Sequence, residues 1–285
     1  MRAQDLAHEV AERLTHSGSP SPGPEARTLV SHVLGIEPAQ LLIASVSPRQ
    51  RAVVDALVEQ RAEGVPLQHL TGVAWFRYET LAVGPGVFIP RPETEEMVGW
   101  ALRELAARPI DRRRVVELCA GSGAITASIA RELGHVELHA VELSPEAHRY
   151  LVHNLEGLDV DVVLGDMADA FRELDGTVDL VIVNPPYIPE AHRLLLPSDV
   201  LQDPAEALFS GADGLDAMHV VAEVATRLLR PDGLLATEHD DSHAPAVVAL
   251  FEAAGFRDVA SHDDLTGRPR YVTASAPSED GRIGL

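Results

Sequence analysis

The sequence is poor in cysteine, in long apolar runs and in basic residues. Cys119 is the single cysteine among 285 residues, which excludes a disulfide within the chain and any metal site built from a cysteine cluster. No apolar run approaches the roughly 20 residues that a membrane-spanning helix needs. Residues 1–14 mix acidic and basic side chains at helical spacing, unlike a signal peptide. We therefore expect a cytoplasmic protein that binds neither a membrane nor a metal ion.

The balance of charge weighs against nucleic acid as a direct partner. Lys and Arg total 23 against 44 Asp and Glu, which gives a formal net charge of −21 at pH 7. Proteins that grip a phosphate backbone usually need clustered basic residues, because neutralising phosphates supplies much of their affinity. The short basic run at 112–114 precedes an apolar strand pattern and is typical of a solvated turn. The composition thus disfavours a duplex substrate.

Hydrophobic spacing predicts a helical N-terminal domain over residues 1–72, because apolar residues there recur every third or fourth position. The Pro-, Ser- and Gly-rich stretch 19–24 predicts a loop, and a third helix is expected over 48–61. The residues that carry the helical spacing are Leu6, Val10, Leu14, Leu29, Val30, Val33, Leu34, Val54, Leu57 and Val58.

Residues 73–92 are expected to form a β-hairpin that links two domains. Their aromatic and β-branched residues favour strands up to Phe88, and Gly84-Pro85-Gly86 interrupts them. The interruption predicts a turn within this segment.

Residues 93–276 alternate short apolar strands with helices, which predicts an α/β domain with a Rossmann-like parallel sheet covered on both faces. Two late strands separated only by a turn predict a C-terminal antiparallel β-hairpin at the sheet edge, and residues 277–285 are expected to be a disordered tail. The predicted strands are 115–118, 136–143, 161–166, 179–183, 233–239, 256–262 and 269–275, and the predicted helices are 124–132, 145–155, 216–229 and 243–254.

The first of these strands ends in a glycine-containing loop, Glu117-Leu118-Cys119-Ala120-Gly121-Ser122-Gly123, which leads into a helix. In an open α/β sheet, ligands bind beyond the carboxyl ends of the strands, and glycines there let the backbone approach the ligand. Thr126 stands where a dinucleotide fingerprint needs glycine, so NAD binding is not supported. Ala120 and Ala124 likewise exclude a nucleophile elbow around Ser122.

The ends of the next two strands carry residues typical of an adenosine pocket. Glu142 lies nineteen positions after Gly123, where a carboxylate can accept hydrogen bonds from both ribose hydroxyls. Asp166 can accept from the adenine amino group, and Met167 can pack its polarizable thioether on the adenine face. Since the sequence offers no loop for a polyphosphate, the pattern predicts a nucleoside ligand without one.

The fourth strand ends in Asn184-Pro185-Pro186-Tyr187, which suits the methylation of a planar amino nitrogen. Such a nitrogen is a poor nucleophile, so two acceptors that bind both of its N–H groups can orient it. The Asn184 side-chain oxygen and the Pro185 carbonyl are predicted to be these acceptors, and the two prolines make the loop rigid. Tyr187 can stack on the planar group. With the adenosine pocket, this catalytic clamp predicts a methyltransferase that uses S-adenosylmethionine.

The chain resembles the bacterial release-factor glutamine methyltransferases (the PrmC/HemK family) over nearly its whole length. The most specific matching segments are Pro66 to Gly72, Phe88 to Glu95, Asn184 to Pro189, and Ala207 to Asp216. The resemblance implies a Rossmann-like class I methyltransferase sheet. It also implies methylation of the side-chain N(5) of the glutamine in the Gly-Gly-Gln motif of class 1 peptide chain release factors, which would be the partner of this chain.

The resemblance also implies which residues hold the cofactor. In the family the glycine loop, the ribose acid and the residue after the adenine acid contact it, and these map to Cys119 through Gly123, Glu142 and Met167. Arg91, Glu93 and Thr94 belong to a segment similar to the one that closes over the methionine end of the cofactor. We add Glu117, Asp166 and Asn184 to the expected cofactor-binding residues.

The chain departs from the family pattern at several of these positions: Glu117-Leu118-Cys119-Ala120-Gly121 stands where the family usually has Asp-Leu-Gly-Thr-Gly, and Glu142 and Met167 also differ. Cys119 occurs where the family usually has glycine, and it lacks the backbone freedom of glycine. Glu142 replaces a commoner aspartate, and Met167 stands where an aromatic residue is frequent. These departures bear on the geometry of the loop and on cofactor affinity.

Two other functions fit parts of the sequence. A DNA adenine-N(6) methyltransferase could use the same clamp on an exocyclic amino group, but base extrusion requires a cationic channel and the charge of −21 argues against it. A catalytically silent adapter could use the N-terminal helices to bind a partner, but the intact catalytic clamp at residues 184–187 (the Asn184 segment) argues against that function. We expect the N-terminal domain to recognise the protein substrate and the chain to be a monomer.

Overall fold

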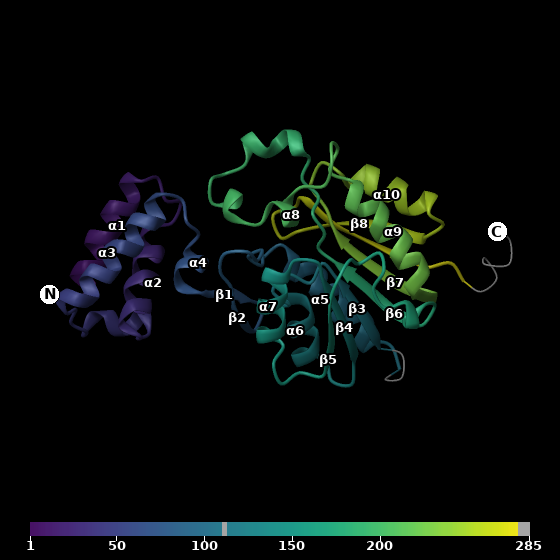
Figure 1. The fold of residues 1–285 in the computed structure, drawn as a ribbon, viewed down its shortest axis with the longest axis horizontal. Helices are drawn as coiled ribbons and strands as arrows, with labels where there is room; N and C mark the ends of the chain where they lie inside the picture. Colours follow the sequence, from purple (N-terminus) through teal and green to yellow (C-terminus); the bar gives the residue numbers. More distant parts are fainter. Residues whose placement is uncertain (110–112, 279–285) are drawn as a thin grey trace. The chain divides into compact units, whose positions relative to one another are not determined.

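The computed structural model describes residues 1–109 and 113–278, so most of the predicted C-terminal tail lies outside the described residues (Figure 1). The described chain divides into two compact units. The first comprises residues 1–73 and 197–202, and the second comprises residues 74–196 and the described chain from 203 onward. In the described part of the chain, no helix has the length and apolar character needed to cross a membrane.

The first unit is the helical bundle that the sequence predicts. Its helices are α1 (Ala3–His16), α2 (Pro22–Leu34), α3 (Pro48–Ala62) and the short α4 (Leu67–Thr71), with the 3-10 turns η1 (Pro38–Leu42) and η5 (Val200–Gln202). Leu6, Val10 and Leu14 are fully buried in its core, as their spacing requires. Arg61 of α3 forms a bidentate ion pair with Glu25 of α2, with N–O distances of 2.8 and 3.1 Å.

The predicted loop at 19–24 is too long, because α2 already begins at Pro22. The first four N–H groups of a helix have no partner within the helix, so proline loses nothing in the first turn. Pro22 and Pro24 therefore start this helix, although their composition resembles that of a loop.

The second unit begins within β1 (Val73–Phe76), which forms a two-stranded sheet with β2 (Glu79–Ala82). Arg77 makes the tight turn with a left-handed φ of 52° and donates to the Glu132 carboxylate at 2.6 and 2.7 Å. Strand structure was expected up to Phe88 but ends at Ala82. The Gly84-Pro85-Gly86 segment ends the pairing, because proline cannot donate to a strand ladder.

The large sheet has seven strands in the order β5-β4-β3-β6-β7-β9-β8. The first five are parallel, whereas β9 runs antiparallel to β7 and β8. Both the parallel sheet and the C-terminal antiparallel pair at its edge are therefore confirmed. The strand bounds are β3 (Arg114–Leu118), β4 (Glu137–Glu142), β5 (Val160–Leu164), β6 (Val178–Val183), β7 (Leu229–Glu238), β8 (Arg257–Asp263) and β9 (Pro269–Ser275).

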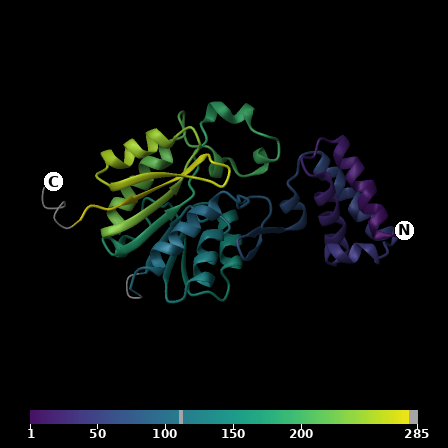
Figure 2. The same ribbon diagram turned by 180° about the vertical axis from the view of Figure 1, so that it is seen from behind.

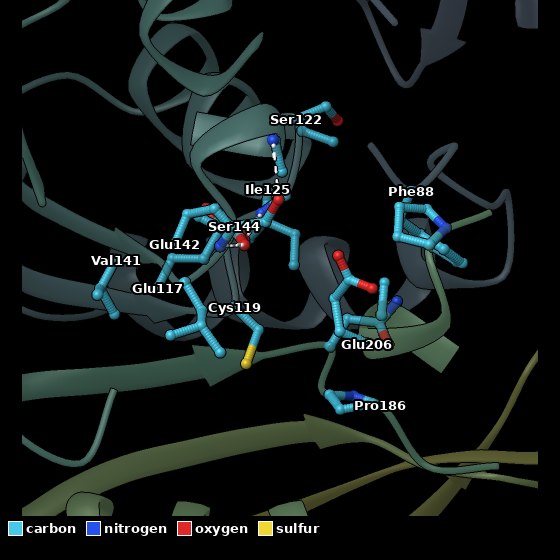
Figure 3. Close-up of a pocket in the computed structure, with 18 of the residues that line it drawn as sticks. Phe88, Glu117, Cys119, Ser122, Ile125, Val141, Glu142, Ser144, Pro186 and Glu206 are labelled. Atoms are coloured by element: carbon cyan, nitrogen blue, oxygen red, sulfur yellow. Dashed lines mark hydrogen bonds between the residues drawn. The ribbon is translucent and has the colours of Figure 1, made fainter. Parts of the chain in front are cut away.

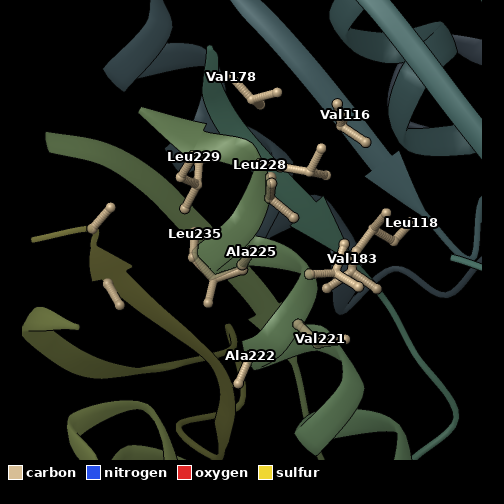
Figure 4. Packing of buried hydrophobic residues seen from close by; sticks show 14 of the residues in the cluster. Val116, Leu118, Val178, Val183, Val221, Ala222, Ala225, Leu228, Leu229 and Leu235 are labelled. Carbon is tan, nitrogen blue, oxygen red and sulfur yellow. The ribbon is translucent and has the colours of Figure 1, made fainter. Parts of the chain in front are cut away.

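Helices cover both faces of this sheet (Figures 1 and 2). On one face, α5 (Thr94–Ala106), α6 (Ala124–Glu132) and α7 (Pro145–Asn154) bury apolar residues against the strands. On the other face, α9 (Asp216–Leu228) and α10 (Ala244–Ala253) do the same. Figure 4 shows Val221, Ala225 and Leu228 of α9 facing strand residues such as Val183 and Leu235. The remaining short elements are η3 (Arg172–Leu174), η4 (Glu190–Leu195) and α8 (Ala205–Leu208).

The strand order places a crevice between β3 and β6. The chain passes from β3 to β4 on one side and from β6 to β7 on the other, so the order reverses between these two neighbours. Ligands of open α/β sheets bind outside the carboxyl ends of the strands at such a point. Leu118 pairs with Val183 as the last residues of the two strands, so Cys119 and Asn184 both follow directly at this edge.

Candidate functional site

A cavity lies at this edge of the sheet, within the second unit, and gathers most of the predicted site residues (Figure 3). In Figure 3, Glu117, Cys119 and Glu142 lie on one side of it, and Phe88, Pro186 and Glu206 lie on the other. The predicted residues that line the cavity are Thr94, Glu117, Cys119, Ala120, Gly121, Ser122, Glu142, Asp166, Met167, Asn184, Pro186 and Tyr187.

Four predicted residues are not among those lining the cavity: Arg91, Glu93, Gly123 and Pro185. Arg91 forms an ion pair with the buried Asp203, and its guanidinium lies 5.0 Å from the centre of the Phe88 ring. Asp203 also accepts a hydrogen bond from the Ile89 backbone at 3.2 Å. Arg91 therefore fixes the loop that carries Phe88, and Phe88 itself reaches the cavity.

The loop after β3 has a left-handed backbone at alternate residues. The φ angles are 52° at Cys119, 55° at Gly121 and 81° at Gly123. Glycine adopts this conformation freely, whereas a residue with a side chain is strained there. Cys119 thus holds a conformation suited to glycine, and its sulfur lies 3.7 Å from that of Met167. Burial raises the pKa of the Cys119 thiol, which disfavours the thiolate and any nucleophilic role.

Gly121 and Gly123 provide a matched pair for testing this loop. An added Cβ meets no atom within 4 Å at Gly121, but at Gly123 it lies 2.8 Å from Leu151 Cδ1 and 3.3 Å from Leu155 Cγ. We expect Gly121→Ala and Gly123→Ala each to cost about 1 kcal/mol through left-handed strain. Gly123→Ala should lose a further 1–3 kcal/mol, roughly, through overpacking.

Urea unfolding of both variants measures this difference, and calorimetry measures cofactor binding. Gly121 lines the cavity, and an added methyl group would occupy space open to the cofactor. Gly121→Ala should therefore weaken cofactor binding clearly, although it lowers stability only slightly. Equal stability of the two variants would contradict the packing role of Gly123.

Glu142 organises the glycine loop from the end of β4. Its carboxylate accepts from the Gly121 N–H at 2.8 Å and from the Ser144 N–H at 2.7 Å. Glu142 is 9% exposed and lines the cavity. An ionised carboxylate offers about four lone-pair sites, so these two bonds leave acceptor capacity for a ligand.

Asp166 and Met167 lie just after β5, at the same edge. The Asp166 side chain is exposed and accepts from the Ala168 N–H at 2.9 Å, whereas Met167 is partly buried against the sheet. Both residues line the cavity. Their contacts with an adenine ring stay a prediction.

Glu117 is buried beneath the loop, only 2% exposed. Its Oε2 accepts from the Thr126 N–H at 2.9 Å and from the Thr126 hydroxyl, so it ties β3 to the first turn of α6. Burial raises the pKa of Glu117 to about 8, the Thr126 donors oppose this rise, and the charge of Glu142 adds to it. Glu117 therefore holds the glycine loop after β3 in place, and it also lines the cavity.

This raised pKa makes stability depend on pH. The folded chain holds a proton on Glu117 up to about pH 8, whereas the unfolded carboxyl releases it near pH 4.5. The stabilisation is complete below pH 4.5 and is lost as the pH rises through 8. Glutamine cannot titrate, so Glu117→Gln should gain about 2 kcal/mol relative to the parent chain between pH 6 and 9. Denaturant unfolding without cofactor tests this, and parallel stability curves across that range would contradict it.

Asn184-Pro185-Pro186-Tyr187 follows β6 at the cavity wall. The Asn184 Nδ2 donates to Thr94 Oγ1 at 3.3 Å, and Pro185 is buried. The Tyr187 hydroxyl donates to Glu238 Oε1 at 2.9 Å. Burial, and then the negative charge of Glu238, raise the pKa of Tyr187, so its hydroxyl keeps its proton. The segment is therefore anchored at both ends.

Glu238 was missed by the sequence reasoning. It ends β7, is 1% exposed, and accepts from Thr94 Oγ1 at 2.6 Å as well as from Tyr187. Burial raises its pKa, and the Thr94 and Tyr187 donors and the charge of Arg270 oppose this rise. Its sequence signal was a carboxylate directly after an apolar strand, the same signal that singled out Glu142.

Comparisons with known proteins identify the family of this chain. Family models described as the PrmC N-terminal domain and the methyltransferase small domain match residues 5–72 and 99–227. The "Release factor glutamine methyltransferase" of Streptomyces coelicolor is 42% identical over 93% of this chain and 95% of that protein. The protein of the same name from Mycolicibacterium smegmatis is 42% identical over 92% of this chain and 93% of that protein.

A solved structure shows the same fold at lower similarity. The catalytic domain of hMettl16, in complex with a MAT2A 3'UTR hairpin, is 14% identical, has a TM-score of 0.56, and is matched over 82% of both chains. The near full-length identity to the two bacterial proteins is far higher. This chain therefore belongs to the release factor glutamine methyltransferase family.

Proposed function

We propose that this chain transfers a methyl group from S-adenosylmethionine to the side-chain N(5) of the glutamine in the Gly-Gly-Gln motif of class 1 peptide chain release factors. One observation carries the proposal. This chain belongs to the release factor glutamine methyltransferase family, and its residues Asn184, Pro186 and Tyr187 line the same cavity as the glycine loop after β3. The chemistry of the two parts is complementary, since one fits a nucleoside and the other fits a planar amide.

The residues of the cavity fit this cofactor. The open space above Gly121 admits a ligand close to the backbone, and Glu142 retains acceptor capacity for ribose hydroxyls. Asp166 and Met167 can meet the adenine ring. The cofactor supplies, when bound, an electrophilic methyl group on a sulfonium.

The Asn184 segment fits the acceptor amide. The Asn184 Oδ1 and the Pro185 carbonyl can accept from the two N–H groups of a glutamine amide, and this fixes the direction of the nitrogen lone pair. Pro185 and Pro186 have fixed φ angles and no N–H donors, so the acceptors need little reorganisation. Tyr187 offers its ring to the planar amide.

The N-terminal bundle, residues 1–72, is the proposed site of release factor recognition. The second unit already contains the whole cavity, and the bundle contributes no residue to its lining. Direct nucleic acid binding is not part of the proposal, because the net charge is −21. The cytoplasmic location and the monomeric state stay predictions.

Methyl transfer from labelled S-adenosylmethionine to purified release factor tests the function, with mass-spectrometric mapping of the modified residue. A release factor whose Gly-Gly-Gln glutamine is replaced by glutamate is the matched control and should take up no label. Label in a DNA oligonucleotide would favour the rival adenine-methylating function, and label in neither substrate would contradict methyl transfer to this motif.

A further inference from the structure

Three polar side chains from three separate elements meet at the end of β6. Thr94 is the first residue of α5, Asn184 directly follows β6, and Glu238 ends β7. The last paired residues of β6 and β7 are Val183 and Thr237, so Asn184 and Glu238 stand side by side one position further along. Thr94 is 4% exposed and Glu238 is 1% exposed, so water competes little for their hydrogen bonds.

The hydrogen bonds of this group all lead towards the Glu238 carboxylate, which accepts from both sides. Glu238 accepts from the hydroxyl of Thr94 at 2.6 Å on one oxygen and from that of Tyr187 at 2.9 Å on the other. A hydroxyl has one proton, so Thr94, having donated to the carboxylate, can only accept from its other neighbour. The neighbour that donates is Asn184 Nδ2, at 3.3 Å.

We infer that Glu238 and Thr94 are positioning residues that set which end of the Asn184 amide faces the acceptor substrate. The Nδ2 group is held against Thr94, so the Oδ1 is the end left to accept from a substrate N–H. A reversed amide would present two N–H donors to another N–H group, and the substrate would lose one acceptor. This inference rests on the proposed function, since it concerns how the clamp presents its acceptor.

Thr94→Val tests this chain of hydrogen bonds, because valine keeps the shape of threonine but removes the hydroxyl. We expect the turnover rate kcat to fall about tenfold, the effect of one lost hydrogen bond in a buried network. The KM for release factor should stay within about twofold, since Asn184 itself remains in place. Thr94 lines the cavity, so the affinity for S-adenosylmethionine is measured in parallel, and it should fall less than kcat. Thr94→Ser keeps the hydroxyl and should restore most of the rate.

The double variant Thr94→Val with Asn184→Ala is the decisive measurement. If Thr94 acts through Asn184, Thr94→Val should have little effect once Asn184 is absent, because effects within one unit are not additive. An equal tenfold loss in both backgrounds would overturn the inference, and so would a loss confined to cofactor affinity. Glu238→Gln should lower kcat in the parent chain and have a smaller effect in the Thr94→Val chain, where only its bond to Tyr187 is left to disturb.

Asp179→Asn is a matched control for removing a buried carboxylate. Asp179 is 3% exposed at the start of β6, at the opposite edge of the sheet, where it pairs with Arg230. Asp179→Asn should lower the stability of the chain and leave kcat unchanged. A tenfold fall in kcat for Asp179→Asn would show that removing any buried carboxylate slows the enzyme, and it would overturn the positioning role of Glu238. A wild-type rate for Asn184→Ala alone would instead refute the proposed clamp. This result differs from those that refute the positioning role of Thr94 and Glu238, so the two failures can be told apart.

Discussion

Asn184→Ala is expected to slow methyl transfer to release factor by at least about 100-fold, the scale for loss of one preorganised polar group in an active site. An amide nitrogen is a weak nucleophile because its lone pair is delocalised, so the protein must orient it instead of relying on its reactivity. Asn184 stands at the switch point of the sheet, and its segment is anchored by Thr94 and Glu238. Truncating it removes one of the two acceptors proposed for the substrate amide.

Single-turnover rates measure this effect directly, with cofactor affinity measured in parallel. The affinity should change much less than the rate, since Glu142 and the glycine loop remain intact. Asn184→Asp keeps an acceptor but replaces the Nδ2 donor to Thr94 with an oxygen, so partial activity should remain. A single-turnover rate of Asn184→Ala near that of the parent chain is incompatible with the clamp.

Glu142→Ala is expected to lower the affinity for S-adenosylmethionine by about 100-fold, and by at least tenfold. Two hydrogen bonds from ribose hydroxyls to a charged acceptor contribute roughly 1.5 kcal/mol each or more. Glu142 also accepts from the Gly121 and Ser144 N–H groups, so its removal leaves the glycine loop without its support. The direct and indirect effects act in the same direction.

Calorimetric titration with the cofactor measures this loss, and Glu137→Ala is the matched control. Glu137 is the same residue type at the opposite end of the same strand, half exposed and paired with Arg114. Its loss should leave affinity unchanged. Unchanged affinity of Glu142→Ala would remove Glu142 from the cofactor site.

Local patterns were sufficient for most of the fold. The helical spacing of Leu6, Val10 and Leu14 predicts a buried helix face, and all three are buried. The alternation of apolar strands with helices predicts the parallel sheet, because crossovers of that length join parallel neighbours. The residues after β3, β4, β5 and β6 could be placed together for the same reason, since the carboxyl ends of parallel strands share one edge.

Element ends depended on effects that composition does not show. Pro22 and Pro24 resemble loop residues, yet they occupy a first helical turn in which proline is tolerated. Val87 and Phe88 have strand-forming side chains, yet they follow a Gly-Pro-Gly segment and are loop residues, and Phe88 lines the cavity.

By itself, the sequence determined the helical bundle, the Rossmann-like sheet, the glycine loop and the Asn184 segment, because each is written in neighbouring residues. Only the tertiary structure decided which distant side chains meet. Arg91 pairs with Asp203, and Thr94 lies between Asn184 and Glu238. The place of Arg91 near the cofactor stays a prediction. Glu238 is 144 positions from Thr94 along the chain. Hydrogen bonds across such separations depend on how the elements pack, and no local pattern of spacing or composition records them.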